Sequence, residues 1–399
     1  MKILITTDWY APVINGVVTS VLNLKEELQR MGHEVRIATL SESGWPRREG
    51  DVYYMRSMPA GKIYPGARAA CIPGCGYAKE LLDWKPDLIH SQCEFSSFLI
   101  AAKIASKLEI PIVHTYHTVY EDYTHYFCPV KPWGRQAAAL FSRLILDKTE
   151  RVIAPTDKVK RLLEGYGVTR PIDVIPTGIR TREFLPESWQ QVHMERSEIR
   201  KRFGIGEDQT VLLSLGRLAR EKNLEEVITS FGQMHRRDME LLIVGDGPYR
   251  KELEELASKQ DGHERIHFAG MVSPQEVPAW YHAGDLFVCA SNSETQGITY
   301  LEALASGLPV ICRKDLCVEG IVRDRENGYR YETPKELQDY CRLLADDGVM
   351  RNLMSAEAVR TGLEYDAKRF GEKVMEVYQR ALETFGRGYA LGQTKEYAG

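Results

Sequence analysis

Residues 291–307 read Ser-Asn-Ser-Glu-Thr-Gln-Gly-Ile-Thr-Tyr-Leu-Glu-Ala-Leu-Ala-Ser-Gly. From Gly297 onward the apolar residues recur at helical spacing, and Gly307 and Pro309 follow as residues that end a helix. The pattern therefore predicts a short helix. With about 100° of rotation per residue, Glu302 falls within the apolar arc that should be buried. Its carboxylate then needs hydrogen-bond donors, because an unpaired buried charge is costly.

The residues just before this helix are suited to an anionic or sugar ligand. Glu294 precedes the helix, and Thr295, Gln296 and Gly297 present backbone N–H groups at its positive end, where a phosphate or a polarised hydroxyl binds. The two hydroxyls of a ribose would supply the donors that Glu302 requires. A helix with one solvated glutamate and one glutamate paired to an arginine would show the same spacing. The rest of the chain must decide between these interpretations.

Composition places the chain among ordinary globular proteins. Its 399 residues suggest two or three domains. No apolar run approaches the roughly 18 residues of a membrane span, and the chain begins as a strand rather than a signal peptide, so we expect a cytoplasmic protein. The eight cysteines lack metal-site spacing and are expected to be free thiols. Residues 1–170 carry 22 Lys and Arg against 18 Asp and Glu, a bias that suits an anionic bilayer but that scatter also explains.

The N-terminal half predicts a doubly wound α/β sheet. Residues 2–7 form an apolar run typical of a buried parallel strand, an amphipathic segment marked by Val17 and Val21 follows, and residues 32–39 give the next strand. The nicotinamide fingerprint GxGxxG is absent. Asn15-Gly16 at the helix start is instead a single-glycine turn that permits close backbone approach.

A second α/β unit follows a change of composition near residue 171. Strands are expected at 210–216, 241–248 and later, with helices at 334–347 and 349–384. The predicted organisation is a Rossmann-like domain at 1–176, a linker at 177–200, a second Rossmann-like domain at 201–367, and a C-terminal helix with a tail at 368–399 that returns to the first domain.

A basic loop follows the first strand of the second domain. Arg217 and Lys222 precede a helix whose start, Asn223 with Glu226, resembles a capping box. Two cations beside helix N–H groups suit a diphosphate. A solvated basic loop would look the same in isolation.

Histidine and tyrosine gather after the strand at 111–115. Residues 114–126 contain three histidines, four tyrosines and two acids, at the end of a strand where doubly wound folds bind ligands. A metal site built on His114 and His117 would require a third ligand in place. We expect no metal.

Two of these motifs together resemble those of retaining glycosyltransferases of the GT-B fold, family four. They are Glu294, seven residues, then Glu302 with Ala-Leu-Ala-Ser-Gly-Leu-Pro, and the run Gly-Arg-x-x-x-Glu-Lys-Asn that contains Arg217 and Lys222. The resemblance implies two Rossmann-like doubly wound domains that face each other across a cleft. It also implies that Arg217 and Lys222 bind the donor pyrophosphate, that Glu302 binds the ribose, and that Glu294 lies beside the transferred sugar.

The histidine-rich segment is similar to that of the bacterial branch of this family that glucosylates diacylglycerol. On that resemblance Gly16 faces the donor phosphate and sugar, His117 lies against the sugar, and Asp122 borders the acceptor hydroxyl. Many relatives carry Gly-Gly in the N-terminal loop and Glu-Gly-Phe-Gly after the first glutamate. This chain has Asn15-Gly16 and Glu294-Thr-Gln-Gly297, which weakens the transfer of their sugar contacts to it.

The resemblance implies an enzyme that moves a hexose, glucose in this branch, from a UDP-sugar to diacylglycerol with retention. No cofactor or metal is expected, since the Asp-x-Asp of metal-dependent glycosyltransferases is absent. The expected partners are the donor and a lipid acceptor, without nucleic acid, at the inner face of the cell membrane. Residues 61–79 and 131–148 are candidates for membrane contact. A soluble acceptor, phosphatidylinositol, a sugar-nucleotide epimerase and a non-catalytic nucleotide-binding protein remain alternatives.

Overall fold

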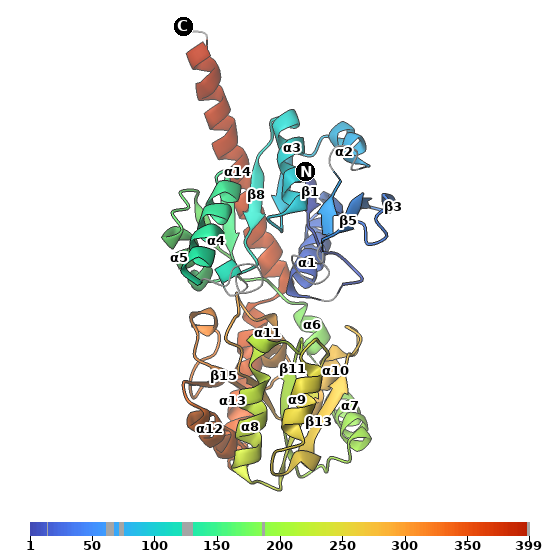
Figure 1. Cartoon of the computed structure of the whole chain (residues 1–399), viewed down its shortest axis with the longest axis vertical. Helices are drawn as coiled ribbons and strands as arrows, with labels where there is room; N and C mark the ends of the chain where they lie inside the picture. Colours follow the sequence, from blue (N-terminus) through green and yellow to red (C-terminus); the bar gives the residue numbers. More distant parts are fainter. Residues whose placement is uncertain (14, 61–67, 72–75, 122–130, 186–187, 397–399) are drawn as a thin grey trace. The chain divides into compact units, whose positions relative to one another are not determined.

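The computed structural model describes residues 1–13, 15–60, 68–71, 76–121, 131–185 and 188–396. The chain divides into two compact units (Figure 1). Unit 1 combines residues Met1–Gly178 with Ala367–Gly399, and unit 2 is the continuous segment Ile179–Asp366. The first unit is therefore assembled from both ends of the chain.

Within the described residues, unit 1 contains an eight-stranded sheet in the order β10-β9-β8-β7-β1-β2-β4-β3. All neighbouring pairs are parallel except β3 with β4. A separate antiparallel pair joins β5 to β6. The strands are β1 (Lys2–Thr6), β2 (Glu34–Leu40), β3 (Arg47–Glu49), β4 (Val52–Met55), β5 (Ser57–Pro59), β6 (Arg68–Ala70), β7 (Leu88–Ser91), β8 (Ile112–Thr115), β9 (Arg151–Ala154) and β10 (Ile172–Val174).

Helices cover both faces of this sheet because successive strand residues point to opposite sides. Ile3 and Ile5 pack with α1 and α14, whereas Leu4 packs with α2 and α3. The strands are therefore apolar on both faces, as a buried parallel sheet requires. The helices of unit 1 are α1 (Gly16–Arg30), α2 (Ala78–Trp84), α3 (Ser96–Leu108), α4 (Lys131–Leu146), α5 (Asp157–Gly165) and α14 (Ala367–Glu396).

Unit 2 contains a parallel sheet in the order β13-β12-β11-β14-β15-β16. This is the Rossmann strand order, in which the first strand and the fourth lie side by side at the sheet centre. The strands are β11 (Thr210–Leu215), β12 (Met239–Val244), β13 (Ile266–Gly270), β14 (Leu286–Cys289), β15 (Val310–Arg313) and β16 (Gly328–Tyr331). Apolar clusters on both sides of the sheet bury these strands.

Eight α-helices accompany this sheet in the described part of unit 2. They are α6 (Thr181–Phe184), α7 (Trp189–Arg202), α8 (Leu224–Met234), α9 (Arg250–Ala257), α10 (Val277–Ala283), α11 (Ile298–Ala305), α12 (Pro334–Asp346) and α13 (Gly348–Glu364). Short 3₁₀ turns include η2 (Arg220–Lys222), which lies between β11 and α8. Residues 291–307 thus comprise the loop that follows β14, helix α11 and the two residues after it.

Both sheets have a topological switch point, where the strand order reverses direction. It lies between β11 and β14 in unit 2 and between β1 and β7 in unit 1. Doubly wound proteins bind ligands in the crevice outside the carboxyl ends of the strands at such a point. Each unit therefore has one preferred edge at which to search for a site.

The structure differs from the sequence expectations in three places. Residues 177–200, interpreted from the sequence as a linker, contain α6 and most of α7 within unit 2. The predicted helix at 349–384 is two helices, α13 and α14, separated at Tyr365–Asp366. The predicted capping box at Asn223 is absent: this residue adopts φ 50° and its side-chain amide donates to Glu226 Oε2 at 3.1 Å, rather than accepting from the helix backbone.

Candidate functional site

At the switch point of unit 2, the loops that follow β11 and β14 are hydrogen-bonded to each other. The backbone N–H of Asn292 donates to the carbonyl of Glu221 at 3.0 Å. The loop containing Arg217 and Lys222 and the loop containing Glu294 are therefore held as neighbours. Two motifs that are about 70 residues apart in sequence meet at the edge where the fold predicts a ligand.

The cations of this edge are held in ion pairs. The Lys222 ammonium donates to Glu294 Oε1 at 2.5 Å, and both side chains are largely buried, with 28% and 14% of their area exposed. Arg217, which is more exposed, pairs with Glu221. An anionic ligand at this edge must therefore compete with a carboxylate for each cation. The sequence predicted Lys222 and Glu294 as neighbours of one ligand, and the structure brings them into direct contact.

A glycine begins helix α11. Gly297 is the N-cap and has φ 75°, a left-handed conformation that favours glycine. A Cβ at this position would lie 2.4 Å from the Tyr300 ring. Gln296 is buried just before it, and Thr295 is partly buried. The predicted N-terminal end of this helix is thus a tight turn at the switch point.

Glu302 lies in the middle of α11, which confirms that it is on a helix. Its Oε2 accepts a hydrogen bond from the Tyr281 hydroxyl at 2.8 Å. Burial, with a smaller contribution from Glu183, raises the pKa of Glu302 to about 7 although the Tyr281 bond opposes the shift. A carboxylate with this pKa is short of donors, and hydroxyl groups of a ligand would supply them.

At the switch point of unit 1, Gly16 is the first residue of α1 and follows the loop after β1. The Asn15 side chain caps this helix by accepting from the Val18 N–H at 2.9 Å. The predicted turn therefore places a helix N-terminus at the ligand-binding edge, as a site for phosphate or for a polarised hydroxyl requires.

The neighbouring strands β7 and β8 end in paired polar side chains. His117, two residues after β8, hydrogen-bonds through Nε2 to Oε1 of Gln92 at 2.7 Å, and Gln92 directly follows β7. His114 Nε2 lies 3.2 Å from Oε1 of the buried Glu94, whose other oxygen accepts from the Tyr120 hydroxyl. The sequence singled out both histidines but not their partners.

Two histidines of this edge have lowered pKa values. Burial and then the neighbouring His114 lower the pKa of His117 to about 3. Burial also lowers the pKa of His90 well below its usual value, with contributions from His114 and His117. The His90 ring nitrogens lie 2.7 Å from the Tyr378 hydroxyl and 2.7 Å from Thr115 Oγ1. Both rings are therefore neutral at physiological pH.

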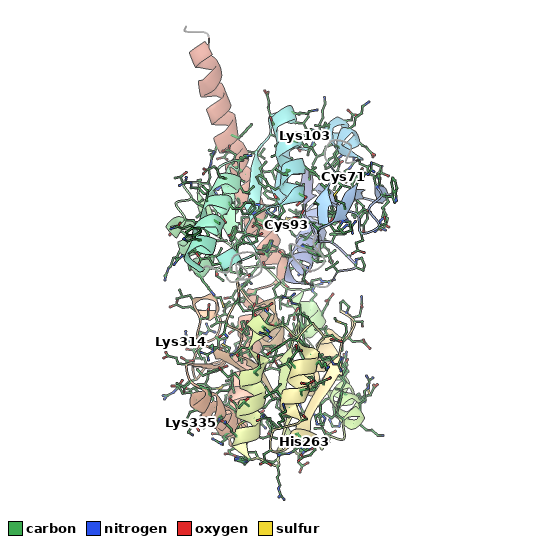
Figure 2. All side chains as sticks on the ribbon, viewed as in Figure 1. Cys71, Cys93, Lys103, His263, Lys314 and Lys335 are labelled. Atoms are coloured by element: carbon green, nitrogen blue, oxygen red, sulfur yellow. The ribbon has the colours of Figure 1, made fainter. Side chains whose placement is uncertain are left out.

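Asp8 and Cys93 complete this edge, and neither belongs to a recognisable sequence motif. Asp8 Oδ1 accepts from the Ser97 N–H at 2.8 Å, and burial raises its pKa to about 6. Burial also raises the pKa of the Cys93 thiol, which lies inside unit 1 (Figure 2), so this cysteine is protonated rather than a nucleophile. Both residues follow the carboxyl ends of β1 and β7, and that position is the signal that would have identified them.

Two further expectations concern residues 122–130 and metals. Asp122, predicted to border an acceptor, lies outside the described residues. Within the part of the chain that the structure describes, no three His, Cys, Asp or Glu side chains are grouped so as to hold a metal ion. Among the described helices, none is long and apolar enough to cross a bilayer.

Two protein families match the two halves of the chain. The family described as "Glycosyltransferase Family 4" matches residues 14–183, and "Glycosyl transferases group 1" matches residues 195–361. Among solved structures, Anabaena Alr3699/HepE in complex with UDP and glucose aligns with a TM-score of 0.75 at 17% identity, over 95% of this chain and 100% of the other. WaaG, a glycosyltransferase involved in lipopolysaccharide biosynthesis, aligns with a TM-score of 0.70 at 18% identity, over 94% and 99%. The fold is that of GT-B glycosyltransferases.

Two relatives are similar over nearly the whole chain. The alpha-monoglucosyldiacylglycerol synthase of Streptococcus pneumoniae is 34% identical over 388 residues, which is 96% of this chain and 86% of that protein. The enzyme of the same name from Acholeplasma laidlawii is 30% identical over 398 residues, 96% of each. The chain therefore belongs to glycosyltransferase family four.

Proposed function

We propose that the protein transfers glucose from UDP-glucose to the free hydroxyl of diacylglycerol, with retention at the anomeric carbon. The observation that carries the proposal is the near-full-length similarity to two alpha-monoglucosyldiacylglycerol synthases. An α-linked product from an α-linked donor requires retention. The residues that the family motif needs are present in unit 2, and its two halves lie in contact at the switch point.

The donor's leaving diphosphate is assigned to Arg217 and Lys222. Negative charge grows on this group as the glycosidic bond breaks, and fixed cations stabilise the transition state because they are already oriented. When the diphosphate binds Lys222, the Glu294 carboxylate is released from an ion pair of 2.5 Å. Glu294 then faces the sugar and stabilises positive charge that develops on its ring. The two residues act as a coupled pair rather than as two independent contacts.

The remaining donor contacts follow from the same resemblance. The ribose hydroxyls donate to Glu302, whose raised pKa reflects a shortage of such donors. The N–H groups near Gly297, after Thr295 and Gln296, supply hydrogen bonds to the donor. Gly16 and His117 are proposed as donor contacts by the family resemblance alone. The acceptor's proton passes to the donor phosphate, because no side chain is assigned as a separate base. Asp122 remains the proposed neighbour of the acceptor hydroxyl.

A lipid acceptor is supported by the outer face of α4, which we define by Trp133, Leu140 and Leu144. These side chains are 74%, 53% and 55% exposed and recur at helical spacing. Arg143, on the same helix between Leu140 and Leu144, is also exposed. An exposed apolar strip with a cation beside it is typical of a helix that rests on an anionic bilayer. We propose that this face contacts the membrane and makes the enzyme peripheral.

Product analysis tests the proposal directly. Radiolabelled nucleotide sugars are supplied with and without vesicles that contain diacylglycerol, and label is followed into the organic phase. The proposal is supported if label enters the lipid only when UDP-glucose and diacylglycerol are both present. The anomeric configuration of the product tests retention, and undiminished turnover after chelator treatment tests metal independence.

A soluble or inositol-based acceptor is the second candidate. D-inositol 3-phosphate glycosyltransferases are 24% to 26% identical over more than nine-tenths of the chain, and one is from Nocardia farcinica. This candidate predicts labelled product in the aqueous phase without vesicles. Nucleotide binding without turnover on any acceptor would instead indicate a non-catalytic protein, and sugar isomerisation without an acceptor would indicate an epimerase.

A further inference from the structure

His117 and Gln92 form a hydrogen-bonded pair at the ends of two adjacent strands. Parallel pairing of β7 with β8 places Ser91 opposite His114, so the residues that follow each strand are neighbours. His117 as a whole residue is partly exposed, whereas Gln92 is 1% exposed. The 2.7 Å contact joins His117 Nε2 to Gln92 Oε1. A fixed buried group thus holds one ring nitrogen of a residue that is itself only partly buried.

The partner of His117 differs in charge from the partner of His114. His114 faces the carboxylate of Glu94, with Nε2 3.2 Å from Oε1. Gln92 offers His117 a neutral carbonyl, which accepts a proton in a hydrogen bond without favouring a second proton on the ring. With Nε2 as the donor, Nδ1 of the neutral ring carries the lone pair. Among the described residues the structure gives Nδ1 of His117 no hydrogen-bond partner.

Packing does not explain a glutamine at position 92. Its Nε2 is buried, and among the described residues it has no hydrogen-bond partner. A buried donor without an acceptor destabilises the fold, and a leucine or methionine would fill a similar volume without this cost. A polar group retained in spite of its cost indicates a function that the polar atom performs.

We propose that Gln92 is a positioning residue that holds His117 as the tautomer protonated on Nε2, so that Nδ1 accepts a hydrogen bond from a hydroxyl of the transferred sugar. The tautomer depends only on unit 1. The sugar contact rests on the proposed function. The titratable groups around the ring are His114 on the same segment and His90 on β7, with Glu94 bonded to His114. Burial and His114 keep the pKa of His117 near 3, so the ring is neutral throughout the working range.

The tautomer is measured by nitrogen NMR of the full-length protein labelled with ¹⁵N-histidine, with the His117 signals assigned by their loss in His117→Gln. We expect a protonated-type shift for Nε2 and an unprotonated-type shift for Nδ1, unchanged from pH 6 to pH 9. In Gln92→Leu a measurable fraction protonated on Nδ1 should appear. A proton on Nδ1 in the wild type, or an unchanged tautomer in Gln92→Leu, overturns the inference. Neither readout requires turnover, so failure of the proposed activity would not be confused with failure of the tautomer.

Kinetics test the consequence for the sugar. Gln92→Leu should lower kcat about tenfold at every pH, because the ring no longer has one fixed acceptor nitrogen. Gln92→Glu has the same shape but raises the pKa of His117. Its kcat relative to wild type should fall at low pH, where the imidazolium cannot accept, and recover at high pH, where the carboxylate still accepts the Nε2 proton. If the kcat of Gln92→Glu relative to wild type does not depend on pH, and thermal unfolding is unchanged, the proposal is contradicted. A purely structural role for Gln92 would not produce a recovery of kcat at high pH.

Discussion

Unit 2 holds its two candidate cations in ion pairs, whereas unit 1 holds His117 and His90 without charge. Lys222 is paired with Glu294, and Arg217 with Glu221. At the corresponding edge of unit 1, His117 is paired with an amide and His90 with two hydroxyls. Two sheets of similar design thus present different electrostatics at their switch points. The difference suits a charged diphosphate on one unit and uncharged hydroxyls on the other.

The largest expected effect is the loss of the cation in unit 2. Lys222→Ala should lower kcat by roughly 10²- to 10³-fold, the usual cost of removing one preorganised group that stabilises transition-state charge. Initial rates of lipid labelling measure it. The matched control is Lys314→Ala, an exposed lysine of the same unit that pairs with Glu332 and is labelled in Figure 2. Equal rates in the two variants would show that the Lys222 cation does not contribute to catalysis, and the proposed role of the unit 2 ion pairs would be wrong.

The pH dependence of UDP affinity should distinguish the Glu302 carboxyl of unit 2 from His117 of unit 1. The pKa of Glu302 is raised to about 7. The proposed hydrogen bonds from the ribose hydroxyls need its ionised form. UDP affinity, measured by calorimetry, should therefore fall about tenfold per pH unit below that pKa and level off above it. Glu302→Gln should abolish this dependence. Persistence of the dependence in the variant would assign it to another group.

The same carboxyl has an effect of opposite sign on the unliganded fold. Because its folded pKa lies above the usual value of 4.5, the folded state binds more protons than the unfolded state between pH 4.5 and about 7. Glu302 therefore destabilises unit 2 increasingly across that window, and fully above it. Glu302→Gln should raise the unfolding midpoint at pH 8 relative to wild type, with a smaller gain at pH 5. A midpoint lowered equally at both pH values would contradict the buried, ionised carboxylate.

The smallest expected effect concerns the outer face of α4. Leu140→Asp with Leu144→Asp should weaken binding to anionic vesicles roughly tenfold, since two exposed apolar contacts are lost and negative charge is added. Sedimentation with vesicles measures it. Leu353→Asp in unit 2, also an exposed leucine at 69%, is the control and should bind as wild type does. Equal losses in both variants would indicate a nonspecific effect of charge.

The sequence predicted the unit 2 site more fully than the unit 1 site. Lys222 and Glu302 stand in contiguous motifs whose loop and helix can be recognised locally, and the structure places both at the switch point. Gln92 and Glu94 follow a strand in a short stretch without pattern, and they gain meaning only when β7 pairs with β8. Pairing between distant strands is information that local periodicity does not contain.

Two misjudged segments have a similar explanation. The stretch before residue 201 has many charges and weak periodicity, yet it forms α7, because Arg200 is fully buried and donates to Asp285 Oδ2 at 2.7 Å. A buried arginine looks like a surface residue in a sequence. Asparagine is a residue type that commonly caps helices, but the left-handed backbone of Asn223 turns its side chain to Glu226 instead.

The assembly of unit 1 from both chain ends has a consequence for biosynthesis. Helix α14 supplies Phe370, Val374 and Tyr378 to the core formed by β1 and α1, and the Tyr378 hydroxyl reaches His90. The ribosome releases these residues after those of unit 2, so the N-terminal segment of unit 1 must wait until unit 2 has been synthesised. A chain stopped at Asp366 should retain the cooperative unfolding of unit 2 and lose that of unit 1. Synthesis of α14 therefore determines when the sheet edge of unit 1 that contains His90 acquires its final form.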